Sequence, residues 1–487
     1  MTITVSKLQS ALKEATQEIP TTTEFEDIPT PATVFTPPSH IRALRLQTSL
    51  VTGARGAGKT FWTMALQQKS IRRLLERDVP DLVDVRVSVG YTNKANPDSY
   101  PSPKIFSQLL KTYSPVDIWR TIWIRAIISQ LNASNLKCPC SRNDWLTDVK
   151  EVTVSTEAVD RFFFEANKML AQSGARILVL FDALDRVAET WEDIDNLTIA
   201  LLQTVLQIST YSHIKGKVFL REDHFNRLDF TFPDSSKLLA TNVLLSWKRT
   251  ELYGLLWKRF CNTSGSSGEL FRQLFTEFLP EGLQEKGGIW NFSPSVELID
   301  DKLRPLFHVL TGPYMGKDRR RGIPYIWTVG HLADARQHTS PRSFLAAIRR
   351  ACEDSRENHM TSKFAIHYES IKQGVQAASE IRVNEMKEDN PWVGGLLESL
   401  KGVTVPCLFQ DIQTIWNRRY PNGPKELAEK HTQYAPPEFS SLQWLDIRKK
   451  LEHLGFCMTM SDGRFNMPDL YRVGFGLGRK GGVKPLK

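Results

Sequence analysis

The sequence predicts an α/β fold built on a parallel β-sheet, and three apolar runs carry this prediction. Residues 44–52 form a short apolar run that leads through a glycine-rich turn into a helical pattern over residues 60–68. Residues 176–181 are almost continuously apolar, which is typical of a central parallel strand covered on both faces. Residues 83–89 alternate valine with polar residues, which predicts a strand at the edge of the sheet with one wet face. Helical patterns separate the three runs, so the strands are expected to be parallel.

The glycine-rich turn matches the pattern G-x-x-x-x-G-K-[ST] in the strand–turn–helix context that a P-loop requires. Glycine lets successive backbone N–H groups converge on a phosphate without interference from a Cβ atom. The ammonium of Lys59 is expected to reach the β- and γ-phosphates, and the Thr60 hydroxyl to ligate Mg²⁺. The alternative is a glycine-rich turn followed by a chance lysine. The predicted phosphate-binding residues are Gly53, Ala54, Arg55, Gly56, Ala57, Gly58, Lys59 and Thr60.

Asp182 directly follows the apolar run of residues 176–181. An apolar strand that ends in an aspartate is the Walker B pattern, in which the carboxylate meets Mg²⁺ beside the P-loop threonine. The structural alternative is a buried strand with an acidic cap. The pairing with residues 53–60 favours a Walker B role, so Thr60 and Asp182 are the predicted metal-binding residues.

The order of strands along the chain predicts the topology of the sheet. Residues 217–220 form a short strand that ends at Arg221, and residues 242–247 form a fifth strand. One strand, residues 83–89, lies in sequence between the P-loop strand and the Walker B strand. This order predicts a sheet with a further strand inserted beside the P-loop strand.

The segment Asp182-Ala183-Leu184-Asp185-Arg186 resembles the hhhhD-x-x-D form of Walker B in STAND-type ATPases and their KAP-like and origin-initiator relatives, within the AAA+-like P-loop proteins. The resemblance implies a three-layer P-loop NTPase core, a helical lid, and ATP with Mg²⁺ as ligands. By the same resemblance Arg221 senses the γ-phosphate. Arg342, in the segment Ser340-Pro341-Arg342-Ser343, would contact the phosphates from the lid.

Two features bear on hydrolysis. Many hydrolytic relatives carry an acid directly after the Walker B aspartate, whereas this chain has Ala183, so Asp185 is the nearest candidate to orient the attacking water. The site is therefore expected to hydrolyse ATP slowly. The basic run of residues 317–322 is either a solvated loop or the source of an arginine finger for a neighbouring subunit.

The C-terminal region predicts a winged-helix plan. Helices are expected over residues 411–419 and 442–454, the second with Ser440 and Gln443 in capping-box register. A β-hairpin follows, with its turn at Ser461-Asp462-Gly463. Nucleic acid and a protein partner are both open as ligands of this module. The basic residues expected to face a polyanion, some of them on a flexible tail, are Arg448, Lys449, Lys450, Arg479 and Lys480.

The composition is that of an ordinary globular protein, with 487 residues and a net charge of +9. No apolar run approaches the length of a membrane span and the N-terminus lacks a signal-peptide core, so a cytoplasmic protein is expected. The six cysteines predict reduced thiols, with a metal at Cys138 and Cys140 as the alternative. The predicted divisions are an N-terminal helix and Thr/Pro-rich linker (1–39), an ATPase core (40–250), a lid (251–355), connecting helices (356–390) and the winged-helix module with a basic tail (391–487).

These features predict an ATP-dependent molecular switch that couples its nucleotide state to a winged helix engaging DNA or a protein effector. A setting in bacterial defence or mobile elements is implied by the resemblance alone. The alternative is an oligomeric, DNA-stimulated AAA+ motor or initiator that uses one of the arginines at residues 319–321 in trans. A small-molecule kinase fits less well, because the sequence after Asp182 offers no acceptor pocket with its own base.

Overall fold

The computed structural model describes residues 4–20, 27–131, 136–430 and 443–485. The chain forms two compact units. The sheet unit comprises Ile28–Pro31 and Thr36–Ser246, and the helical unit comprises Met1–Asp27, Ala32–Phe35 and Trp247–Lys487. Each unit is described by itself.

The sheet unit is built on five parallel strands in the order β2-β3-β4-β1-β5. As predicted, the apolar Walker B strand β3 is central and buried, the alternating strand β2 lies at the edge, and a further strand, β4, is inserted beside the P-loop strand β1. The strands are β1 (Leu50–Gly53), β2 (Val85–Tyr91), β3 (Arg176–Phe181), β4 (Ile214–Arg221) and β5 (Val243–Leu245).

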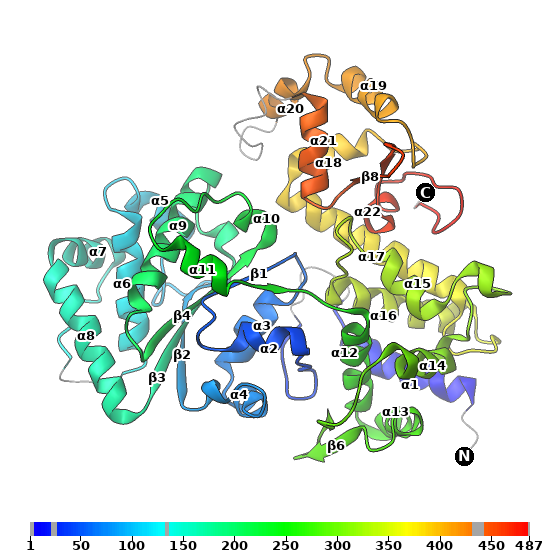
Figure 1. The fold of residues 1–487 in the computed structure, drawn as a ribbon, viewed down its shortest axis with the longest axis horizontal. Helices are drawn as coiled ribbons and strands as arrows, with labels where there is room; N and C mark the ends of the chain where they lie inside the picture. The colour runs from blue at the N-terminus through cyan, green and yellow to red at the C-terminus, as the bar shows by residue number, and fades with distance from the viewer. Residues whose placement is uncertain (1–3, 21–26, 132–135, 431–442, 486–487) are drawn as a thin grey trace. The chain divides into compact units, whose positions relative to one another are not determined.

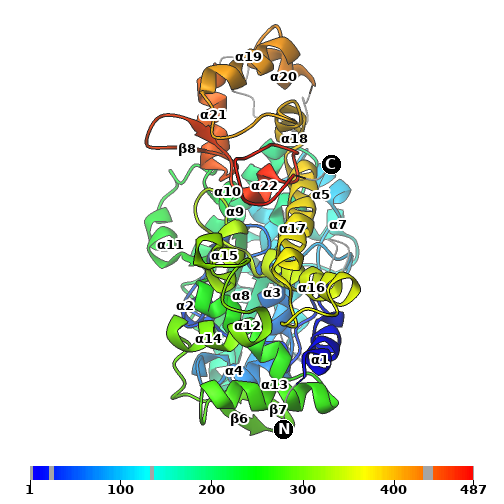
Figure 2. The ribbon, with the colours of Figure 1, turned by 90° about the vertical axis from the view of Figure 1, so that its right-hand side faces the viewer.

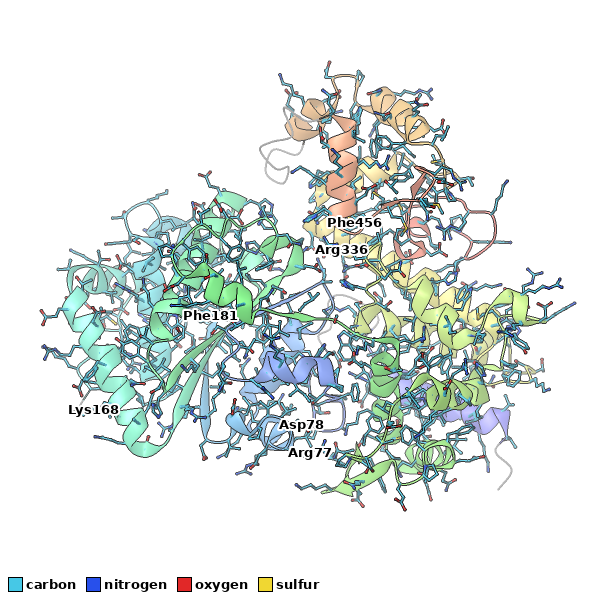
Figure 3. All side chains as sticks on the ribbon, viewed as in Figure 1. Arg77, Asp78, Lys168, Phe181, Arg336 and Phe456 are labelled. Atoms are coloured by element: carbon cyan, nitrogen blue, oxygen red, sulfur yellow. The ribbon has the colours of Figure 1, made fainter. Side chains whose placement is uncertain are left out.

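Helices cover both faces of this sheet, which gives three layers (Figure 1). The predicted P-loop helix, α3 (Lys59–Gln67), packs on one face with α4 (Lys69–Leu75) beside it. The other face carries α6 (Pro115–Ile128), α8 (Thr156–Ser173) and α9 (Trp191–Ile208). Phe181, labelled in Figure 3, is fully buried at the end of β3 against Trp119 and Trp123 of α6. The smaller helices are α2 (Pro38–Leu44), α5 (Pro103–Leu109), α7 (Trp145–Val154), α10 (Glu222–Phe225) and α11 (Ser235–Thr241).

One boundary of the sheet unit differs from the expectation. The first strand begins only at Leu50, because Leu44 is the last residue of α2, and the carbonyls of Ala43, Arg45 and Thr48 accept hydrogen bonds from the buried Nζ of Lys217. Residues 136–151 contain α7, whose N-terminus is capped by Asp144. Ser155 lies at the N-cap position of α8, but its side chain makes no capping hydrogen bond.

The helical unit starts with the predicted N-terminal amphipathic helix, α1 (Val5–Gln17), which buries Leu8 and Leu12 against α13 and α16. The long helix α17 lies beside α16 and α22 (Figure 2). The elements as far as α17 are α12 (Arg249–Cys261), α13 (Gly265–Phe278), the hairpin β6 (Leu283–Lys286) and β7 (Ile289–Phe292), α14 (Asp300–Thr311), α15 (Pro324–His331), α16 (Pro341–Asn358) and α17 (Tyr368–Asp389).

The C-terminal part of this unit contains the predicted helices and hairpin. The strands β8 and β9 pair in antiparallel fashion around the turn at residues 461–463. The backbone of Cys407 forms an isolated antiparallel β-bridge with Phe465 of β9. Helix α21 has a capping box formed by Gln443 and Asp446. The predicted pairing of Ser440 with Gln443 lies outside the described residues. The elements are α18 (Pro391–Glu398), α19 (Phe409–Arg419), α20 (Pro424–Lys430), α21 (Trp444–His453), β8 (Met458–Thr459), β9 (Phe465–Asn466) and α22 (Asp469–Arg472).

The basic tail is held more tightly than expected. Arg472 is fully buried and donates hydrogen bonds to Asp469 and to the carbonyls of Leu477 and Val483, so the chain folds around its guanidinium as far as residue 485. Arg479, expected on a flexible arm, pairs with Asp469 at 2.8 Å. Since an engaged guanidinium has little freedom to follow a phosphate, this arginine is not part of a free arm.

The basic face of α21 also differs from the expectation. Arg448, expected to face solvent, pairs with Glu452 at 3.0 Å and lies over the ring of Phe409. Its side chain is therefore only 12% exposed. Lys449 and Lys480 are exposed, and Lys450 is partly exposed. In the part of the chain that the structure describes, none of the helices has the length and apolar character needed to span a bilayer.

Candidate nucleotide-binding site

The glycine-rich turn forms a loop at the carboxyl end of β1. Gly56 and Gly58 adopt φ values of +80° and +109°, which side chains with a Cβ atom rarely adopt. Gly58 is also the N-cap of α3, so Lys59 is the first helical residue. The loop therefore presents the N-terminus of α3 and its positive dipole end towards the centre of the turn.

The Lys59 ammonium lies inside this loop. Its Nζ atom donates hydrogen bonds to the carbonyl oxygens of Gly53 and Ala54, at 2.8 and 2.9 Å. Burial and, to a smaller extent, the nearby Arg221 lower the pKa of Lys59 to about 8, while Asp182 acts in the opposite direction. The ammonium is only partly exposed, so a phosphate would replace the hydration that it has lost in this loop.

Asp182 is the second central group. The carboxylate is 2% exposed, and its Oδ2 atom has no hydrogen-bond partner among the described residues. Burial raises the pKa of Asp182, although a hydrogen bond from the Thr60 hydroxyl and the charge of Lys59 lower it in part. A buried carboxylate oxygen without a partner beside a hydroxyl is the kind of donor set that takes a hard cation such as Mg²⁺. These residues therefore fit a magnesium ion.

Ala183 gives the chain after β3 its sharp turn. Its φ of +56° is in the left-handed region, which costs a non-glycine residue about 1 kcal/mol. The turn continues into a single 3₁₀ turn, η2 (Leu184–Arg186), so Asp185 returns towards the same sheet edge. The Tyr91 hydroxyl fixes this turn by donating to the carbonyl of Arg186 at 2.8 Å.

Arg221 lies at the same edge, because β1 and β4 are paired with Gly53 opposite Arg221. Its guanidinium makes two hydrogen bonds to Asp223, at 3.0 and 2.7 Å, and an ion pair with Asp185 at 3.5 Å. Although burial opposes it, the charge of Arg221 holds the pKa of Asp223 well below its usual range. Asp223 was missed from the sequence. The available signal was its position two residues after Arg221, because a short turn is enough for a carboxylate to accept two hydrogen bonds from a nearby guanidinium.

The structure thus brings together five of the predicted site residues. Lys59, Thr60, Asp182, Asp185 and Arg221 are linked by the contacts and electrostatic interactions above. Arg342 belongs to the helical unit, where it starts α16 and pairs with the buried Glu385 at 2.6 Å. Its contact with a nucleotide stays a prediction.

A second set of residues that the sequence did not reveal holds the P-loop helix α3 in place. His40 is fully buried, and Trp62 of α3 donates to its Nδ1 at 3.1 Å. The other ring nitrogen, Nε2, lies 3.0 Å from the carbonyl oxygen of Ser246, so it carries the proton. The neutral imidazole therefore joins Trp62 of α3 to Ser246, which lies 206 positions from His40 along the chain. Only tertiary packing brings these partners together.

His40 makes the stability of the sheet unit depend on pH. Burial lowers the pKa of His40 to about 4, although its backbone hydrogen bond to Ser246 opposes the shift. Its contribution is fully present above the unfolded-state pKa of 6.5 and is lost as the pH falls to about 4. We expect the free energy of unfolding to drop by about 3 kcal/mol over this window through His40 alone. Urea unfolding of the wild type and of His40→Gln at several pH values measures this, and a pH-independent difference between them would contradict it.

No protein-family model matches the sequence, and no curated protein matches it. Among solved structures, Cdc6p from Pyrobaculum aerophilum is 13% identical, with a TM-score of 0.29 over 88% of this chain and 84% of that chain. The Aeropyrum pernix ORC2 protein in its ADPNP-ADP complexes is 12% identical, with a TM-score of 0.36 over 87% of this chain and 84% of that chain. Its ADP form is 12% identical, with a TM-score of 0.27 over 90% and 92%.

The sequence identities and the TM-scores are both low, so the chemical assignment of the site depends on its own residues. The parallel sheet with β4 inserted between β1 and β3, the loop at residues 53–60 and the flanking helices establish the architecture. The sheet unit has the α/β fold of a P-loop NTPase.

Proposed function

We propose that the sheet unit binds ATP together with Mg²⁺ and hydrolyses it slowly. The observation that carries this proposal is the buried, unpartnered Oδ2 atom of Asp182 beside the Thr60 hydroxyl and the partly buried Lys59. A buried carboxylate oxygen without a hydrogen-bond donor destabilises a protein unless a ligand compensates for it. The preference for adenine comes from the family resemblance of the motifs at residues 53–60 and 182–186.

Different residues of the site would contact the phosphates and the metal ion. Lys59 would leave the carbonyls of Gly53 and Ala54 and donate to the β- and γ-phosphate oxygens. The backbone amides at the start of α3 would hold the same phosphates. Thr60 and Asp182 would hold Mg²⁺, which supplies charge neutralisation to the phosphates when bound.

The hydrolytic step would depend on Asp185 and Arg221. With Ala183 in the position after Asp182, Asp185 is the acid nearest to the expected attacking water, which it would orient. Its ion pair with Arg221 competes for the same carboxylate oxygens, and this competition supports slow turnover. Arg221 would stabilise negative charge that builds up on the γ-phosphate.

Asp223 is expected to position Arg221 for this step. We predict that Asp223→Asn lowers the turnover number about tenfold while the affinity for ATP changes less than about threefold, because a misaimed guanidinium weakens the transition state more than the ground state. Asp223→Glu should restore part of the rate, since it keeps the charge. Asp234→Asn is the matched control, because Asp234 is an exposed acid of the same unit that pairs with Lys237.

This prediction is checked by steady-state ATPase rates together with equilibrium ATP binding. An equal loss of affinity and rate in Asp223→Asn would mean that the pair acts on ground-state binding instead. Unchanged turnover would remove Asp223 from the mechanism.

The C-terminal part of the helical unit is proposed to be a winged helix that responds to the nucleotide. The order of α18, the bridge at Cys407, α19, α21 and the β8–β9 hairpin supports this assignment. Lys449 and Lys480 are exposed cations that could meet a nucleic acid, and the same module could meet a protein effector. Arg342 would contact the phosphates after leaving Glu385, which would couple the lid to the nucleotide.

One observation supports a second candidate, an oligomeric DNA-stimulated ATPase. The 3₁₀ turn η3 (Arg319–Arg321) carries three exposed arginines, and one of them could serve as an arginine finger for a neighbouring copy. ATPase rates with and without duplex DNA, with mass measurements with and without ATP, separate the two candidates. The switch predicts slow turnover that DNA changes little. The motor predicts DNA-stimulated turnover and an ATP-dependent oligomer, and both should be lost in a variant with alanine at residues 319–321.

A further inference from the structure

A pocket of about 570 Å³ lies within the helical unit, apart from the residues assigned above to the nucleotide. One wall is α15, with Ile326, Trp327 and His331, and the opposite wall is the chain from β8 to α22, with Met458 and Asp469. The turn after α15 is joined to the chain after α21, where the backbone N–H of Ala335 donates to the carbonyl of Gly455 at 3.0 Å. Arg336 and Phe456, labelled in Figure 3, mark this junction. A volume of this size suits a small organic ligand.

Asp469 supplies an acceptor in the pocket that nothing in the described chain satisfies. Its side chain is 2% exposed. The Oδ1 atom accepts from Arg472 and Arg479, both at 2.8 Å, whereas Oδ2 has no hydrogen-bond partner among the described residues. An orphaned oxygen on a buried carboxylate calls for a donor from outside.

His331 supplies a second acceptor next to it. Its Nδ1 atom lies 2.9 Å from the carbonyl oxygen of Trp327, which can only accept, so Nδ1 carries the proton. Burial lowers the pKa of His331, which keeps the ring neutral. Its Nε2 atom therefore carries a lone pair and acts as a hydrogen-bond acceptor. This atom lies 3.7 Å from Asp469 Oδ2. Two acceptors thus face each other across the gap, so a ligand must bring two donors.

The charged side chains that line the pocket balance one another, which favours a neutral ligand. Arg319 and Arg479 line it together with Asp334 and Asp469. The guanidiniums of Arg472 and Arg479 already pair with Asp469, so this carboxylate needs no further cation, and a neutral N–H group is enough for its free oxygen. The ring of Trp327 stacks on His331 with centroids 3.8 Å apart and an angle of 21°, and this offers a flat aromatic wall. The pocket therefore favours a flat, neutral ligand.

We propose that this pocket binds a planar nitrogen heterocycle whose edge carries a ring N–H beside an exocyclic amine, as the guanine base does. The two parallel N–H groups would donate to Asp469 Oδ2 and His331 Nε2. The ring would lie along the Trp327 wall and the apolar side chains of Ile326 and Met458. A free nucleoside and a guanine in a single strand both present this edge, so either can supply the base.

Guanosine, inosine and adenosine are the probes, titrated calorimetrically into the full-length protein. They lack phosphates, and the titrations are repeated with saturating Mg-ATP and in Lys59→Ala, so that the P-loop does not contribute. We expect guanosine to bind at least about tenfold more tightly than inosine, which lacks only the exocyclic amine, and adenosine to bind no better than inosine. Deoxyoligonucleotides of thymidine with one central dG, dI or dA test whether a strand supplies the base.

His331→Phe is the main variant, because it keeps an aromatic ring against Trp327 and removes the Nε2 acceptor. It should lower guanosine affinity about tenfold and abolish the preference over inosine. His359→Phe, in the same unit and outside the pocket, is the matched control and should leave both unchanged. Asp469→Asn tests the second acceptor, with its folding checked by thermal unfolding. Absence of guanosine binding, equal affinities for guanosine and inosine, or an unaltered preference in His331→Phe would overturn the proposal, and none of these outcomes depends on ATP binding.

Discussion

Lys59→Ala is expected to lower the affinity for ATP at least about 100-fold. The ammonium would make charge-assisted hydrogen bonds to two phosphates, and each is worth about 1.5–3 kcal/mol. The structure places this cation at the centre of the loop, with Nζ on the carbonyls of Gly53 and Ala54. Alanine leaves the same backbone amides and removes the positive charge at the centre of the loop. Titration calorimetry with ATP and Mg²⁺ measures the change.

The control for this variant is Lys69→Ala, which removes an exposed lysine of α4 in the same unit. Its ATP affinity should match that of the wild type. Thermal unfolding in the absence of ATP shows whether Lys59→Ala is folded, because the two carbonyl contacts of Lys59 are lost with it. A folded Lys59→Ala protein that binds ATP as tightly as the wild type would contradict the assignment of this loop.

Asp182→Asn is expected to have opposite effects on activity and on stability. The variant should lose Mg²⁺-dependent ATP hydrolysis by at least about 100-fold, because the amide cannot replace the carboxylate charge beside the metal. The ligand-free protein should become more stable by about 1 kcal/mol, because the buried carboxylate no longer has to be desolvated. ATPase assays and thermal unfolding measure the two effects.

The sign of the stability effect follows from the pKa of Asp182, which burial raises above its usual value. A group of this kind favours folding below its unfolded-state pKa, and this contribution is lost as the pH rises through the higher folded-state pKa. At neutral pH the ionised Asp182 therefore opposes folding, and asparagine removes the opposition. The stability gain should shrink as the pH falls towards 4. A loss of stability at neutral pH, or unchanged hydrolysis, would contradict the role of Asp182.

The comparison of sequence and structure shows which features local patterns can predict. Residues 53–60 and the apolar run before Asp182 carry their structure in short segments, so the loop, α3 and β3 were predicted correctly. The order of strands along the chain predicted a further strand beside β1, and the structure shows that this strand is β4, which sets Arg221 opposite Gly53. Each of these depends on residues that are near one another in the chain or on a general rule of sheet topology.

Partners from distant parts of the chain could not be predicted. In the link from Trp62 through His40 to Ser246, the last residue lies 206 positions from His40 along the chain. The three carbonyls that accept hydrogen bonds from Lys217 are also distant from it in sequence. The same limit explains Arg479, which looked like part of a free cationic arm but pairs with Asp469. Periodicity tells which residues are buried, whereas packing decides which residue a buried charge meets.

Thr60 and Asp182 are expected to hold a metal beside a triphosphate in the loop at residues 53–60. A crystal structure of the protein grown with Mn²⁺ and a non-hydrolysable ATP analogue tests this assignment through the anomalous signal of manganese. We expect a manganese peak at about 2.2 Å from the Thr60 hydroxyl oxygen, bridged to Asp182 directly or through one water, with Lys59 on the β- and γ-phosphates. A nucleotide bound elsewhere, or a manganese peak remote from both residues, would contradict it.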